Sequence, residues 1–220
     1  MVNDAVTFGI DPAAGHPERM LALSYAPADR RRTLAALFAL DATLAKLALG
    51  TREPLVAQMR LTWWYEALSA LSAAAPPAQP ILRVLQAAQV DGEALAAMIE
   101  GWERLLDEPD EAALRAFAVA RAGLFRVAGD LLGASDLVEK AGQGWALADL
   151  ARITARPETR ASATRLATPL LASACKWRWS GTGRPLGALA HSARMDLVGH
   201  SAPGSPARVG RLAWHRLTGR

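Results

Sequence analysis

The chain has 220 residues, 51% of them hydrophobic, and a formal net charge of +4. This length suits a single sizeable domain with an ample core. Its start lacks the basic-then-apolar order of a signal peptide, and Asp41 and Lys46 interrupt its longest apolar stretch, so neither a leader nor a membrane-spanning helix is expected. Cys175 is the only cysteine, which excludes an internal disulfide and favours a reducing, cytoplasmic location.

Proline and glycine divide the sequence into a series of helices. Alanine and leucine dominate, and no window alternates as a strand does, so the expected fold class is all-α. The expected helices cover residues 17–26, 28–49, 53–74, 80–88, 92–106, 110–132, 135–155, 158–178 with an interruption near Pro169, and 185–197. We expect residues 1–197 to form one helical domain. Residues 198–220 then form a basic tail containing proline and glycine, which ends in a basic helix or in no regular structure.

Positive charge is concentrated in the C-terminal third. Residues 1–151 carry 13 Lys+Arg and 19 Asp+Glu (net −6), whereas residues 152–220 carry 12 and 2 (net +10). This asymmetry indicates contact with a lipid surface, an acidic partner or the acidic N-terminal part of the chain itself, and a solvated arginine-rich tail explains it equally well. CKWRW (175–179) and RLAWHRLTGR (211–220) mix tryptophan with arginine as interfacial segments do, which predicts a peripheral position at the inner face of an anionic membrane. No nucleic-acid-binding module is recognisable, so nucleic acid is not an expected partner.

The residue types of common catalytic and metal sites do not occur in the required arrangements. The four histidines have no zinc-type spacing, and GHS (199–201) and GTGRPLG (181–187) lie in connectors rather than at a strand-to-helix turn. Glu100, Glu103 and Asp107 share one face of an expected helix and could hold Mg²⁺. Their place at a helix C-terminus is electrostatically poor, which favours a solvated acidic face instead.

Several segments, taken in order, carry a family resemblance: YAPADRRRTLAALFALDATLAKL (25–47), EPLVAQMRLTWWYEALSAL (53–71), ALAAMIEGWERLLDEPD (94–110), AFAVARAGLFRVAGDLLG (116–133) and, more weakly, AGQGWALADLARI (141–153). Together they resemble the squalene/phytoene synthase family. The resemblance implies an isoprenoid-synthase fold, a bundle of antiparallel helices around a central cavity. It also implies head-to-head joining of two allylic diphosphates with Mg²⁺, which two aspartate-rich segments on facing helices hold.

The sequence departs from the active pattern in both aspartate-rich segments. Where the resemblance implies an acidic cluster after ALFAL, the chain has Asp41 alone, followed by Lys46. Where it implies aspartates after the arginine matching Arg152, the chain has Ile153, and only Asp149 precedes that arginine. Lone carboxylates are poor Mg²⁺ ligands, so we expect no catalytic residue, no metal site and no cofactor. The chain is in this respect similar to a branch of the family that lacks both motifs and includes a mitochondrial assembly factor for respiratory complex I.

Two functional hypotheses follow. The first is a non-catalytic binding or assembly protein that keeps the apolar cavity for an isoprenoid or lipid ligand, or that binds a protein partner. The second is an active prenyltransferase that condenses farnesyl or geranylgeranyl diphosphate, with Mg²⁺ held by Asp41 and Asp149 or by the acidic row at 100–107. Released pyrophosphate would distinguish the two.

Asp41, Arg60, Trp63, Trp64 and Asp149 are the candidate residues of the cavity. Neighbouring residues of a helix point about 100° apart, so Trp63 and Trp64 face different directions. Arg60 lies one turn before Trp64 and could meet an anionic head group, with a surface ion pair as the alternative. The aromatic residues that could line the cavity are Trp63, Trp64, Tyr65, Trp102 and Trp145, although core packing is an ordinary role for each.

Overall fold

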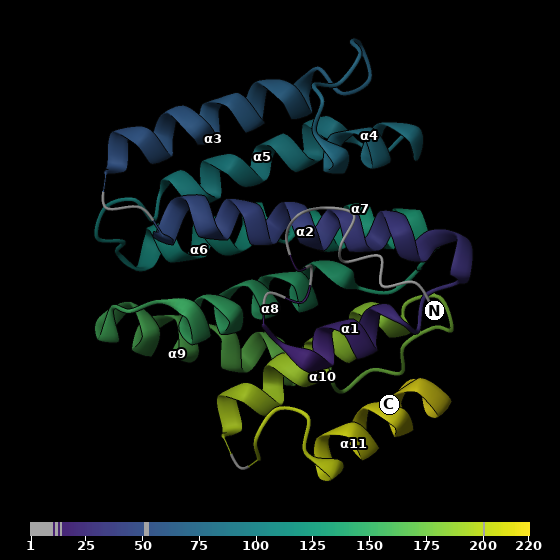
Figure 1. Cartoon of the computed structure of the whole chain (residues 1–220). Coiled ribbons are helices and arrows are strands. Elements are labelled where there is room, and N and C mark those ends of the chain that lie inside the picture. Colours follow the sequence, from purple (N-terminus) through teal and green to yellow (C-terminus); the bar gives the residue numbers. More distant parts are fainter. Residues whose placement is uncertain (1–10, 12, 14, 51–52, 200) are drawn as a thin grey trace.

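The structure is a computed structural model that describes residues 11, 13, 15–50, 53–199 and 201–220. In that part of the chain every regular element is a helix (Figure 1), which confirms the all-α prediction. The helices are α1 Pro17–Leu23, α2 Ala28–Gly50, α3 Pro54–Ser69, α4 Pro80–Ala87, α5 Gly92–Glu103, α6 Glu111–Arg121, α7 Gly123–Leu132, α8 Val138–Ile153, α9 Pro157–Ala174, α10 Arg184–Val198 and α11 Pro206–Thr218.

Helix α2 runs through the middle of the bundle. It packs against α3, α4, α5 and α7, and α8 packs against α6, α7, α9 and α10 (Figure 1). Residues 33–42 are all buried, which is the pattern of a helix that is apolar on every side. By length and composition α2 could cross a membrane, but 67% of its apolar window is buried inside the fold, and the core helix of a bundle passes the same test.

Two expectations about helix continuity are wrong, and the helices expected over 53–74 and 158–178 end earlier, at Ser69 and Ala174. The helix expected over 110–132 is divided at Ala122 into α6 and α7. A Cβ on Gly123 would lie 3.1 Å from the carbonyl oxygen of Ala94, so glycine reduces crowding where the start of α7 closely approaches α5. In α9 the helix continues through Pro169 without interruption. This proline is exposed, so the carbonyl that it leaves without a helical partner can be hydrated.

The last helix, α11, folds back onto the body of the protein. Of the two outcomes expected for the end of the chain, a basic helix is the one that occurs. All three guanidinium nitrogens of Arg208 donate hydrogen bonds. Its Nη2 donates to Glu18 Oε2 on α1 and to Asp196 Oδ1 on α10, each at 2.6 Å. Glu18 and Arg208 are 1% and 2% exposed. The basic C-terminal third therefore contacts the acidic N-terminal part of the chain at Glu18, which is one of the contacts that the charge asymmetry indicates.

Candidate functional site

A buried ion-pair network joins α2, α6 and α8 at the centre of the bundle. Arg121 on α6 is fully buried and binds Asp41 on α2 through two hydrogen bonds, Nε to Oδ1 at 2.7 Å and Nη2 to Oδ2 at 2.6 Å. The same Nη2 donates to Asp149 Oδ2 on α8 at 2.5 Å, and Nη1 donates to the carbonyl oxygen of Ala146 at 3.1 Å. One guanidinium thus bridges the two carboxylates that the sequence singled out.

Asp149 has two further cationic partners. Its Oδ1 accepts from Arg19 Nη2 at 2.9 Å and from Arg152 Nη2 at 2.8 Å. Burial alone would raise the pKa of Asp149, but the charges of Arg121, Arg19 and Arg152 outweigh it and hold this pKa far below its usual range. Burial likewise acts to lower the pKa of Arg121, and Asp41 and Asp149 outweigh it and raise this pKa. Asp149 and Arg121 are therefore both charged at neutral pH.

Aromatic rings enclose the bridging guanidinium. The Arg121 Cζ atom lies 4.3 Å from the ring centroid of Trp145, 4.7 Å from that of Trp102 and 5.7 Å from that of Phe117. Such contacts are favourable because the ring faces carry negative charge density. Trp145 also meets Phe38 of α2 edge to face, with centroids 5.6 Å apart. A cation and its aromatic neighbours therefore fill the interior between α2, α6 and α8, where a central cavity was expected.

A cleft of about 240 Å³ lies beside the network. It is lined by Arg19, Asp41, Ala42, Ala45, Lys46, Leu49, Gly50, Asp149, Arg152 and Ile153. Arg19 is 2% exposed, and its Nη1 has no hydrogen-bond partner among the residues described. Lys46 is exposed and forms no ion pair with a described carboxylate. The three cations of the lining outnumber its two carboxylates, so the cleft favours an anion.

The candidate residues on α3 lie away from this network. Trp64 is 5% exposed and packs into the core, whereas Trp63 is 42% exposed, with the two rings edge to face at 5.1 Å. Arg60 is exposed, and neither tryptophan nor Arg60 lines the cleft. Trp63 continues an outward apolar stripe that includes Leu55 and Met59, one helical turn apart. Of the paired tryptophans, Trp64 thus lies on the buried face of a peripheral helix and Trp63 on its exposed face.

Sequence reasoning missed Arg19 and Arg121, although a signal for the second was present. Arg121 is the only charged residue between Arg115 and Arg126, in the otherwise apolar stretch AFAVARAGLF. A cation in the buried face of an apolar helix needs a carboxylate partner, because an unpaired buried charge is very costly. Asp41 and Asp149 meet that requirement in the structure. They lie 80 and 28 residues from Arg121, and no sequence pattern links residues at such separations.

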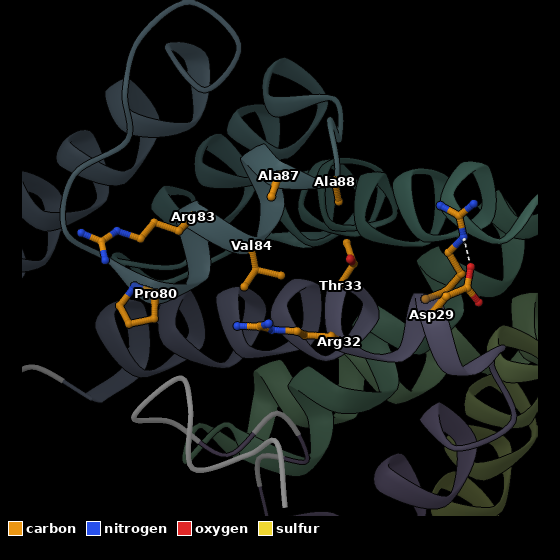
Figure 2. Close-up of a pocket in the computed structure, with 9 residues that line it drawn as sticks. Asp29, Arg32, Thr33, Pro80, Arg83, Val84, Ala87 and Ala88 are labelled. Atoms are coloured by element: carbon orange, nitrogen blue, oxygen red, sulfur yellow. Dashed lines mark ion pairs between the residues drawn. The ribbon is translucent and has the colours of Figure 1, made fainter. Parts of the chain in front are cut away.

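A larger groove, of about 520 Å³, lies between the start of α2 and α4 (Figure 2). It is lined by Asp29, Arg30, Arg32, Thr33, Pro80, Arg83, Val84, Ala87 and Ala88. Its charged side chains are all exposed, and Asp29 and Arg30 pair with each other at 3.2 Å. Neither carboxylate of the buried network lines this groove, so it is a separate surface feature.

The comparison with known families identifies the chain. Residues 13–160, more than half of it, match the family described as squalene/phytoene synthase. The chain belongs to the squalene/phytoene synthase family. No curated protein and no solved structure gives a significant match. The region that matches squalene/phytoene synthase contains every residue of the ion-pair network and ends before α10 and α11.

The residues at the network do not fit the magnesium ions that the squalene/phytoene synthase family implies. Both oxygens of Asp41 accept from Arg121, and the oxygens of Asp149 accept from three guanidiniums. Within the described part of the chain, the acidic row at 100–107 included, no group of three or more His, Cys, Asp or Glu could hold a metal ion. Mg²⁺ needs several oxygen ligands, and a fixed cation between the carboxylates repels it.

Proposed function

We propose that the chain is a non-catalytic member of the squalene/phytoene synthase family that acts as a binding or assembly protein. The observation that supports this is the Arg121 guanidinium bound to both Asp41 and Asp149. Ionisation of a prenyl diphosphate requires metal ions to carry the negative charge of the departing diphosphate. A buried cation that is already neutralised by both carboxylates leaves them no free oxygen ligands for such ions.

The ligand class that suits the cleft is an isoprenoid or lipid with an anionic head group. Arg152 and Lys46 offer donors, and Leu49 and Ile153 provide apolar wall. A volume of about 240 Å³ lies below the roughly 300–1,000 Å³ of typical ligand pockets. It has room for one head group and the first carbons of its chain, but not for two prenyl diphosphates side by side.

The test measures turnover and binding on the same full-length protein. We expect no released pyrophosphate from farnesyl or geranylgeranyl diphosphate, with or without Mg²⁺, and an increase in Tm with farnesyl diphosphate in EDTA. Lys46→Glu should abolish that increase, because it places a carboxylate at the cleft. Arg83→Glu is the matched control, since Arg83 is an exposed cation outside the cleft.

Magnesium-dependent pyrophosphate release that Asp41→Asn abolishes would refute the non-catalytic proposal and establish the prenyltransferase alternative. A Tm that farnesyl diphosphate does not change in EDTA would refute the ligand class. A Tm increase that Lys46→Glu and Arg83→Glu reduce equally would refute the cleft as its site.

A further inference from the structure

Helix α11 has a buried face and an exposed apolar face. Its buried residues are Arg208, Leu212 and His215, which attach the helix to the body. On the other side Trp214 is 59% exposed and Leu217 is 74% exposed, three residues apart and therefore on one face. Large apolar side chains exposed together indicate a surface that meets another apolar phase or a partner.

A second exposed tryptophan lies on the segment that borders this helix. Trp177 is 65% exposed, in the connection between α9 and α10. Two residues later the chain is attached to the end of α11, where Trp179 N donates to the carbonyl oxygen of Gly219 at 2.7 Å and Arg178 Nε donates to that of Thr218 at 3.0 Å. The two segments that mix tryptophan with arginine in the sequence are therefore neighbours in the fold.

The C-terminal sequence that carries these residues is rich in positive charge. Between residues 175 and 220 the only acidic residue is Asp196, and it is already paired with Arg208. The cations in this region that form no ion pair with a described carboxylate are Lys176, Arg178, Arg184, Arg194, Arg211, Arg216 and Arg220. One further described carboxylate, that of Asp136, borders Trp177 and Arg178 and accepts from Ser180. The seven cations outnumber it, so the net charge is complementary to an anionic surface.

Helix α3 provides a comparison within the same molecule. It exposes an apolar stripe of similar kind, with Leu55 at 69%, Met59 at 67% and Trp63 at 42%. Its charged residues from position 53 onward are Glu53, Arg60 and Glu66, so this stripe has no excess of positive charge. The two surfaces share exposed apolar side chains and differ in charge.

We propose that the exposed face of α11, together with Trp177, binds the surface of an anionic lipid bilayer. Tryptophan side chains favour the boundary between water and hydrocarbon because they are apolar with one polar N–H. Unpaired lysine and arginine residues beside them attract anionic lipid head groups, and an apolar face bordered by cations is typical of helices that lie in the interface. This proposal is independent of the cleft and of catalysis, because α11 lies outside the region that matches the family.

Co-sedimentation of the full-length protein with phosphatidylcholine vesicles, with and without phosphatidylserine, tests this proposal. We expect binding only to vesicles that contain phosphatidylserine, and weaker binding as salt rises from about 0.1 M to about 0.5 M. Trp214→Ala with Leu217→Ala should weaken binding by about tenfold, because both side chains lose their apolar contact with the lipid. Lys176→Gln with Arg220→Gln should weaken it by roughly 25-fold, since each cation near the surface contributes about a fivefold increase.

The matched control is Met59→Ala with Trp63→Ala, which removes exposed apolar side chains of α3. All six positions are exposed, so we expect every variant to keep the circular dichroism spectrum and Tm of the parent protein. Equal binding to neutral vesicles would overturn the proposal, as would binding that Trp214→Ala with Leu217→Ala leaves unchanged or that the α3 control weakens equally. A concentration-dependent dimer that Trp214→Ala with Leu217→Ala dissociates would also overturn it, in favour of a second copy of the chain as the occupant.

Discussion

Replacement of Arg121 by methionine tests the buried network most directly. The variant leaves Asp41 fully buried and without either of its hydrogen bonds from Arg121, whereas Asp149 keeps Arg19 and Arg152. Removal of one partner from a buried ion pair costs about 3–5 kcal/mol. For a protein of this size each kcal/mol lowers Tm by about 2–4 °C, so we expect a fall of roughly 10 °C. Urea unfolding followed by circular dichroism measures the free-energy difference, and calorimetry measures Tm.

A double variant separates the lost pair from a simple packing defect. Arg121→Met with Asp41→Leu removes both charges, and we expect it to recover most of the lost stability because apolar replacements of buried ion pairs are often neutral or stabilising. Arg115→Met on the same helix is the control, since its pair with Glu111 is exposed and contributes little. A loss below about 1 kcal/mol in Arg121→Met, or no recovery in the double variant, would refute the reasoning that Arg121 neutralises Asp41.

Further predictions concern packing and pH. A Cβ on Gly92 would lie 2.3 Å from the carbonyl oxygen of Leu68, so Gly92→Ala should destabilise the protein by about 2 kcal/mol, whereas Gly210→Ala, with nothing within 4 Å, should stabilise it by roughly 0.5–1 kcal/mol. Urea midpoints that shift in the same direction would contradict this contrast. Burial lowers the pKa of His191 to about 3 and that of His215 to about 4. Below the unfolded pKa of about 6.5 the unfolded chain therefore binds more protons than the folded chain, so the free energy of unfolding should fall from about pH 7 to pH 5. This slope should be smaller in His191→Gln, and equal urea midpoints over this range would be the contrary result.

The sequence predicts the helices well where proline, glycine and N-capping residues mark their ends. Asp91 accepts from the N–H of Ala94 and Asp110 from that of Ala113, as expected of capping residues. These local signals do not report how closely two helices approach. The helix divides at Ala122, beside the close approach of Gly123 to α5, and no proline or capping residue marks that point in the sequence.

The candidate site is predictable only in part. Asp41 and Asp149 stand out because the family resemblance implies acidic residues near their positions, and the structure brings them to one guanidinium. That the guanidinium belongs to Arg121 depends on how α2, α6 and α8 are packed. The tryptophans at 63 and 64 are conspicuous in the sequence, but their position on a peripheral helix depends on which face of α3 meets α5 and α2.

The salt bridge between Arg121 and Asp41 also constrains how this chain can evolve. New acidic residues on α2 or α8 would still face a buried guanidinium, so they alone would not create a divalent-cation site. Loss of Arg121 first would leave Asp41 buried without a counter-charge, at a cost comparable to much of the stability of a typical domain. Divalent-cation binding between α2 and α8 would therefore require coordinated substitutions on separate helices, because Arg121 and Asp41 each depend on the other.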